Sequence, residues 1–283
     1  MKVILAYIFR GLLMILYTPL KLLVTDNDKI IFLSRQSNEP SIDFILLKDE
    51  LLKKNKDLKI TIICSRVDKD IKSKIIFLLA LLRSLYHLST SKVCILDSYW
   101  PAVSMLKHKK KLKVIQLWHS IGKVKRSGYQ TLDKTYGRSK ALARVMRMHK
   151  NYDAIIAGGE AWNSYYCQSF GVTLDKLYNL GLPRIDYLLM KEGETRNKVL
   201  EAYPEFREKP MVLYAPTFRR NGELDCSDFL EYFNFDKFAL VIKEHPNQRV
   251  VFKQKNRVYR CEDFTAKELL TACEYLITDY SAI

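Results

Sequence analysis

Two histidines follow short apolar runs, at positions where a side chain could exchange protons with a bound substrate. His119 comes after the run 113–117, within the segment QLWHSIGKVKRSGYQ (116–130), and His245 comes after the run 238–243. An imidazole titrates near neutral pH, and the cations beside both histidines suit a substrate that carries phosphate. Both histidines are therefore candidate acid–base residues. An ordinary turn histidine is the alternative for each of them taken alone.

Other groups that can bind phosphate lie at the ends of apolar runs, in the motifs APTFRR and ITDYSAI and at the residue two positions before His245. The candidate donor- and phosphate-binding residues are Thr217, Arg219, Lys243, Thr278, Asp279 and Ser281. Hydroxyl groups and backbone amides at the start of a helix can hold phosphate oxygens, and the arginine fork can bond two of them. A proline-led turn with solvated arginines, and simple helix capping by Ser281, are the alternatives.

Alternating apolar runs and amphipathic stretches predict the elements that position these residues. Buried strands are predicted at 29–34, 59–64, 92–96, 113–117 and 153–157. Helices are predicted between and after them at about 41–54, 72–88, 100–109, 133–150 and 160–170. A second set contains a helix at about 192–202 and strands at 211–215, 238–243, 257–259 and 274–278. This order predicts an α/β fold with parallel sheets, in which ligands bind beyond the carboxyl ends of the strands.

The distribution of charge indicates two domains. The net charge is +16, of which residues 1–190 hold +17 and residues 191–283 hold −1. We predict an apolar segment at 1–25, a basic Rossmann-like domain at 26–190 and a second Rossmann-like domain at 191–283, with a site in the cleft between the domains. The basic domain requires an anionic partner such as lipid head groups or a polyanionic polymer.

The first 24 residues, MKVILAYIFRGLLMILYTPLKLLV, are strongly apolar but include Lys2, Arg10 and Lys21. On a helical wheel these three cations lie within about 100° of one another. An apolar helix with one basic stripe is typical of a segment that lies in the membrane interface. A transmembrane span and a helix packed on the domain core are the alternatives, and no cleavage site for a signal peptide follows.

A second basic stripe is predicted on the helix near 138–150. Lys140, Arg144 and Arg147 are spaced at i, i+4 and i+7, opposite apolar residues. We expect this face to contact anionic lipid or polymer, with a solvated surface helix as the alternative. Nucleic acid is not an expected partner, because no nucleic-acid-binding motif accompanies the charge.

The sequence predicts no metal site and no required cofactor. The six cysteines include no C-x-x-C pair and no histidine at ligand spacing, so reduced thiols in a cytosolic setting are expected. Glycine-rich dinucleotide and P-loop motifs are absent from the sequence.

Five motifs in this order resemble the CDP-glycerol:poly(glycerophosphate) glycerophosphotransferase family of teichoic acid synthesis. They are QLWHSIGKVKRSGYQ, GLPRIDYLL, VLYAPTFRR, IKEHPN and LLTACEYLITDYSAI, and the early stretch IIFLSRQSNEPSIDFILL is similar to members of the same family. The resemblance implies a GT-B-like fold with an acceptor domain and a nucleotide-donor domain, attached peripherally to the cytoplasmic face of the cell membrane. It also implies transfer of glycerol phosphate from CDP-glycerol to a hydroxyl group of a lipid-linked teichoic acid precursor, with release of CMP.

The resemblance assigns roles to individual residues. His119 matches a catalytic histidine, expected to be the base for the acceptor hydroxyl, and His245 matches a second one, expected to contact the donor phosphates. The six phosphate-binding candidates match motif positions near the donor. Family members continue past the last motif with a further helix and strand–helix units, so we expect the second domain to be truncated here.

Two alternative functions remain open from the sequence. One is a GT-B transferase with a sugar-nucleotide or CDP-ribitol donor. The other is a non-catalytic protein whose basic domain binds membrane or polyanion. The sequence predicts no oligomeric state.

Overall fold

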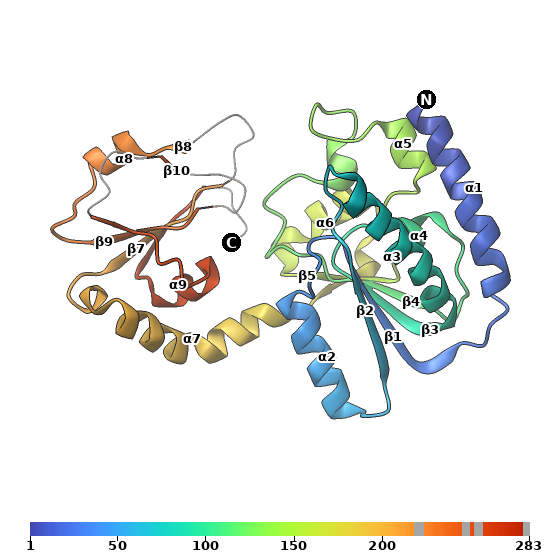
Figure 1. Ribbon diagram of the computed structural model, residues 1–283, viewed down its shortest axis with the longest axis horizontal. Coiled ribbons are helices and arrows are strands. Elements are labelled where there is room, and N and C mark those ends of the chain that lie inside the picture. The colour runs from blue at the N-terminus through green and yellow to red at the C-terminus, as the bar shows by residue number, and fades with distance from the viewer. Residues whose placement is uncertain (218–223, 245–249, 252–256, 280–283) are drawn as a thin grey trace. The chain divides into compact units, whose positions relative to one another are not determined.

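The computed structural model describes residues 1–217, 224–244, 250–251 and 257–279, and the chain divides into two compact units, Met1–Arg184 and Ile185–Ile283 (Figure 1). Each unit is built on a parallel β-sheet with helices packed on it. The predicted α/β class with parallel sheets is confirmed.

Six parallel strands form the sheet of the first unit, in the order β2-β1-β3-β4-β5-β6. The strands are β1 (Asp26–Ser34), β2 (Lys59–Cys64), β3 (Ser91–Leu96), β4 (Lys113–Gln116), β5 (Ala154–Ala157) and β6 (Leu177–Asn179). The five predicted strands are present, because apolar runs that can be buried on both faces are typical of parallel sheets. The sequence does not predict β6, which has three residues and no apolar run.

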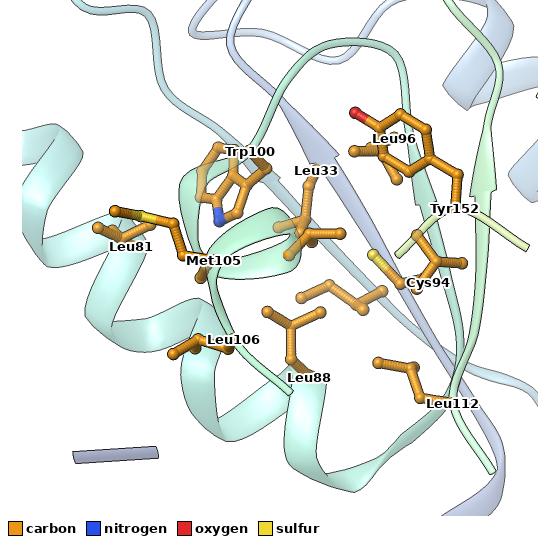
Figure 2. Packing of buried hydrophobic residues seen from close by; sticks show 14 of the residues in the cluster. Leu33, Leu81, Leu88, Cys94, Leu96, Trp100, Met105, Leu106, Leu112 and Tyr152 are labelled. Atoms are coloured by element: carbon orange, nitrogen blue, oxygen red, sulfur yellow. The ribbon is translucent and has the colours of Figure 1, made fainter. Parts of the chain in front are cut away.

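The helices of this unit are α1 (Lys2–Leu20), α2 (Ile42–Lys54), α3 (Ile71–Thr90), α4 (Pro101–Met105), α5 (Lys140–Val145) and α6 (Asn163–Phe170). In Figure 1, α3 crosses in front of the sheet. Figure 2 shows part of the core between them, which includes Leu33 and Leu96 of the strands, Leu81 and Leu88 of α3, and Trp100. The indole of Trp100 is fully buried and donates a hydrogen bond to Ser84 at 2.9 Å, so its one polar group is satisfied.

The helix predicted at 133–150 is wrong in its length. In the structure α5 covers only Lys140–Val145, and Arg147, His149 and Asn151 have φ angles of 46°, 59° and 72°. These angles belong to the left-handed region, through which a right-handed helix cannot continue. Arg147 therefore does not extend the stripe of Lys140 and Arg144 along one helix.

Two other helix boundaries differ from the predictions. The helix expected at 100–109 ends at Met105, and the helix expected at 192–202 begins nine residues earlier as α7 (Pro183–Ala202). Proline is favoured in the first turn of a helix because its fixed φ suits that turn and its missing N–H is not needed there.

The N-terminal helix α1 contacts α3 and α5 and buries only Ala6, Leu13 and Tyr17. The Tyr17 hydroxyl donates to Nδ1 of His108 at 2.8 Å, while Nε2 of His108 donates to a main-chain carbonyl oxygen. Most other apolar side chains of α1 lie on the surface. By length and composition α1 could cross a membrane, and it is the one such helix among the described residues.

The second unit contains a four-stranded parallel sheet in the order β11-β9-β7-β12 and a separate pair, β10-β8. Its elements after α7 are β7 (Met211–Tyr214), β8 (Leu224–Asp225), α8 (Ser227–Glu231), β9 (Ala239–Ile242), β10 (Val250–Val251), β11 (Val258–Tyr259), α9 (Ala266–Ala272) and β12 (Tyr275–Ile277). One face of β7 and β9 packs on α7 and α9, and the other face packs on α8. The four predicted strands are present, whereas β8, β10, α8 and α9 were not predicted.

Candidate active site

His119 lies in the loop that follows β4, at the carboxyl end of the sheet. Trp118 turns the chain there with a φ of 65°, and its ring centre lies 4.0 Å from that of His119. Nδ1 of His119 lies 2.8 Å from the main-chain carbonyl oxygen of Asp97, which follows β3. A carbonyl oxygen can only accept, so Nδ1 carries the proton and the neutral ring presents Nε2 as a base.

The surroundings of His119 favour this neutral form. Burial lowers the pKa of His119 to about 4, because the charged ring would be poorly solvated. The hydrogen bond to Asp97 opposes this shift, whereas the positive charges of Lys123 and Arg184 add to it. At neutral pH His119 is therefore ready to accept a proton.

Asp97 itself is almost fully buried beneath this loop. Its Oδ2 accepts a hydrogen bond from the Ser34 hydroxyl at 2.9 Å, whereas Oδ1 has no partner among the described residues. Burial raises the pKa of Asp97 to about 6. The main chain of Asp97 orients the histidine, while its side chain ties the ends of β1 and β3 together.

A buried ion pair supports the same loop from the other side. The guanidinium of Arg184, in the first turn of α7, contacts the Asp43 carboxylate through Nε at 2.7 Å and also through Nη2. The Arg184 main-chain N–H donates to Asp43 at 2.9 Å, and Nη1 lies 3.4 Å from the His119 carbonyl oxygen. Asp43 and Arg184 thus join α2, α7 and the His119 loop.

Lys123, one of the cations that follow His119 in the sequence, is buried in the loop. Its ammonium lies 3.9 Å from the ring centre of Trp118 and 4.8 Å from that of Phe170, and it donates to the Ser127 hydroxyl. Burial lowers the pKa of Lys123 to about 7. Lys123 therefore fixes the loop that carries Trp118 and His119.

A pocket of about 370 Å³ opens beside His119. It is lined by Arg35, Gln36, Ser98, Tyr99, Trp118, His119, Gly128, Thr131, Tyr136, Gly137, Arg138, Met148 and His149. Gly128 has a φ of 55°, and a Cβ there would lie 2.1 Å from the Ser169 carbonyl oxygen. Glycine is therefore required at that position of the wall.

His149 is a second histidine of this pocket, and no role was predicted for it. It is buried, its Nδ1 lies 3.2 Å from the Tyr152 hydroxyl, and its ring packs edge-on against Phe170 at 4.8 Å. Burial lowers its pKa to about 3, so it too is neutral at neutral pH. It was missed because it was placed on a helix that in fact ends at Val145.

Asp43 and Arg184 were also missed. Arg184 stands in the motif GLPRIDYLL, and a cation in the first turn of a helix is opposed by the helix dipole unless an anion balances it. That placement was the available signal for a partner. The sequence holds no indication that the partner is Asp43, 141 residues away.

In the second unit, the described donor-site candidates lie at the carboxyl ends of adjacent strands. Thr217 follows β7, Lys243 follows β9, and Thr278 and Asp279 follow β12. The register aligns Tyr214 with both Ile242 and Ile277, so these three strand ends are level. The sheet therefore brings Thr217, Lys243, Thr278 and Asp279 to one edge.

Hydrogen bonds fix this edge and leave one hydroxyl unused. The Thr217 N–H donates to Asp279 at 2.9 Å, the Thr278 hydroxyl donates to the Ala215 carbonyl oxygen at 2.7 Å, and the Lys243 ammonium donates to that of Cys261 at 3.0 Å. The Thr217 hydroxyl is buried and has no partner within the described part of the chain. His245, Arg219 and Ser281 lie outside the described residues.

The cations predicted to contact membrane or polymer lie on neighbouring elements. Lys2 and Arg10 are on α1, Lys140 and Arg144 are on α5, and the two helices pack together. Arg147 follows α5 in the left-handed turn. Among the described residues, no cluster of histidine, cysteine, aspartate and glutamate side chains could hold a metal ion.

Comparison with protein families gives one match that covers most of the chain. The model described as CDP-Glycerol:Poly(glycerophosphate) glycerophosphotransferase matches residues 15–283. The chain is 30% identical to the teichoic acid ribitol-phosphate primase of Bacillus spizizenii, over 100% of this chain and 76% of that protein. It is 29% identical to the teichoic acid poly(ribitol-phosphate) polymerase of the same species, over 94% of this chain and 44% of that protein. It is also 28% identical to the teichoic acid glycerol-phosphate primase of Bacillus subtilis, over 72% of this chain and 54% of that protein.

Solved structures of the wall teichoic acid polymerase TagF have the same fold. One of them superposes with a TM-score of 0.65 at 16% identity, covering 91% of this chain and 67% of that chain. A TagF structure soaked with CDPG gives the same TM-score.

Proposed function

The chain belongs to the CDP-glycerol:poly(glycerophosphate) glycerophosphotransferase family, and on that premise we propose that it transfers glycerol phosphate from CDP-glycerol to a hydroxyl group of a lipid-linked acceptor. As a member of this family, the chain is a transferase of teichoic acid synthesis. The donor and the acceptor are the proposed parts.

The geometry of His119 is the observation that carries the proposal. Its Nδ1 proton is donated to the Asp97 carbonyl oxygen, so Nε2 is left without a proton and can act as a base. In the proposed step, Nε2 takes the proton of the acceptor hydroxyl while the hydroxyl oxygen forms a bond to the phosphorus atom that bears glycerol. The bond from that phosphorus to the oxygen of CMP breaks, and CMP leaves with the electron pair.

The strand ends of the second unit are proposed to bind the donor. The Thr217 hydroxyl, which has no partner among the described residues, is available to donate to a phosphate oxygen, and Lys243 supplies a positive charge at the end of the next strand. His245, Arg219 and Ser281 keep the donor-contact roles that the family resemblance implies.

A ribitol donor is the second candidate, and a specific observation favours it. The two relatives at 30% and 29% identity are a ribitol-phosphate primase and a ribitol-phosphate polymerase. A panel of CDP-glycerol, CDP-ribitol and UDP-sugars, with CMP or UDP release as the readout, separates the candidates. Faster release from CDP-ribitol would replace the glycerol assignment, and release of UDP alone would contradict both.

The role of His119 is tested in the same assay. We expect His119→Asn to lower kcat by about 10²-fold to 10⁴-fold, the usual contribution of a positioned general base. His87→Asn, on α3 and outside the pocket, is the matched control and should keep its activity. Equal turnover by His119→Asn and the control would show that His119 is not the base.

We also propose that the first unit binds the cytoplasmic face of the membrane peripherally. Exposed apolar side chains on α1 (Ile4, Ile8 and Ile15) and on α3 (Ile71, Ile75 and Leu79) supply surface for the bilayer interface. Cations of α1 and α5 supply attraction for anionic head groups.

A further inference from the structure

We propose that the pocket beside His119 holds a phosphate group of the acceptor, bound by the guanidinium groups of Arg35 and Arg138. The identity of this ligand rests on the proposed function. The anion site itself follows from the side chains of the pocket.

Arg35 lines the pocket, and several of its N–H donors are not used in hydrogen bonds to the described residues. It follows β1 directly, its guanidinium lies 5.1 Å from the centre of the Phe77 ring, and Nη1 donates to the Tyr99 carbonyl oxygen at 3.3 Å. Nε is buried and has no hydrogen-bond partner among the described residues. Since a guanidinium has five N–H donors, Arg35 keeps donors for a ligand.

Arg138 reaches the same pocket from a different segment, just before α5. Its guanidinium lies 5.3 Å from the centre of the Tyr99 ring. Tyr99 thus contacts both arginines, one through its carbonyl oxygen and one through its ring. Burial lowers the pKa of Arg35, and the positive charge of Arg138 lowers it further, as expected for two cations that repel each other.

The described residues do not neutralise the positive charge of the pocket. Among the described residues, no carboxylate lines the pocket and neither arginine forms an ion pair. The two pocket histidines are neutral at neutral pH, so they neither attract nor repel a bound anion by a net charge. Two partly desolvated cations with no counter-charge favour a bound anion, and the arginine fork matches phosphate oxygens.

The remaining lining indicates what the phosphate is attached to. Ser98, Thr131 and Tyr136 provide hydroxyl groups, and His119 provides the base. The pocket volume of about 370 Å³ has room for a small polyol phosphate. The ligand class is therefore a polyol phosphate, which brings a phosphate to the arginines and a free hydroxyl group to His119.

Calorimetric titration of the full chain with glycerol 3-phosphate, inorganic phosphate and glycerol at neutral pH tests the site. We expect both phosphates to bind and glycerol alone not to bind. Arg35→Gln and Arg138→Gln should each weaken glycerol 3-phosphate binding at least tenfold. Arg66→Gln, which removes an exposed arginine outside the pocket, should leave binding unchanged. Equal binding by all variants, or binding of glycerol as tight as that of glycerol 3-phosphate, would overturn the proposal.

Arg35→Lys and Arg138→Lys show whether a loss of binding is caused by misfolding. They keep the positive charge but remove the planar guanidinium that can bond two phosphate oxygens. They should bind inorganic phosphate more tightly than the glutamine variants do. In the transfer assay, Arg138→Gln should raise KM for the acceptor and leave KM for the donor unchanged. Loss of phosphate binding in the arginine variants, combined with undiminished turnover in His119→Asn, would refute the proposed function and retain the anion site.

Discussion

Asp43 and Arg184 are 141 residues apart in the sequence, yet their side chains form an ion pair that is almost excluded from solvent. The pair joins the first turns of α2 and α7, and its arginine also reaches the carbonyl oxygen of His119. The pair therefore supports both the stability of the first unit and the position of His119.

We predict that breaking this pair is costly. Asp43→Asn should lower the free energy of unfolding by about 3–5 kcal/mol, because it leaves the Arg184 charge buried without a counter-charge. It should also lower kcat, because Arg184 no longer holds the His119 loop. Chemical denaturation and the transfer assay measure the two effects.

Glu50→Gln is the matched control for this change. It breaks the exposed pair with Lys53 and should leave the unfolding midpoint unchanged. If Asp43→Asn were as stable as this control, the buried pair would have no structural role.

The pH dependence of transfer should reflect the lowered pKa of His119. Above its pKa of about 4 the ring is neutral and accepts a proton; below it, the ring is protonated and cannot. We therefore expect kcat/KM to fall on the acid side near pH 4 and not near the usual histidine value of 6.5. Lys123→Met should move this fall to higher pH, because the Lys123 charge lowers the pKa of His119. An unchanged profile in Lys123→Met would contradict the electrostatic link.

Thr217→Val should separate binding from stability. The Thr217 hydroxyl is buried and unpartnered among the described residues, so replacing it by a methyl group should leave the unfolding midpoint unchanged or slightly raised. If the hydroxyl bonds a donor phosphate, KM for CDP-glycerol should rise several-fold. Thr278→Val is the contrasting variant, since it loses a hydrogen bond to Ala215 and should cost about 1 kcal/mol of stability. A normal donor KM in Thr217→Val would exclude that contact.

Ile8→Ser combined with Ile15→Ser tests the membrane surface of α1. Both side chains are exposed, so the double variant should fold normally and sediment less with vesicles of phosphatidylglycerol. Leu189→Ser combined with Met190→Ser, on an exposed part of α7, is the control and should sediment like the unmodified protein. Equal sedimentation by both double variants would argue against α1 as the membrane contact.

The sequence alone predicted the class of fold and the strand ends at which several candidate site residues lie. Strands such as β1 and β9 were predictable because buried parallel strands need continuous apolar runs, and these runs are visible in a single chain. The placement of His119, Thr217 and Lys243 at carboxyl strand ends followed from the same runs. Short elements such as β6 and β8 were not predictable, because two or three residues carry no periodic signal.

Tertiary structure decided which side chains surround those positions. The pairing of Asp43 with Arg184, and the meeting of Arg35 with Arg138 around Tyr99, join segments far apart in the chain. His149 lines the pocket because α5 ends at Val145 and the chain then passes through residues with left-handed φ angles. These angles could not be predicted from the residue types. Sequence periodicity records which face of an element is buried, whereas the partners across that face depend on how the whole chain is folded.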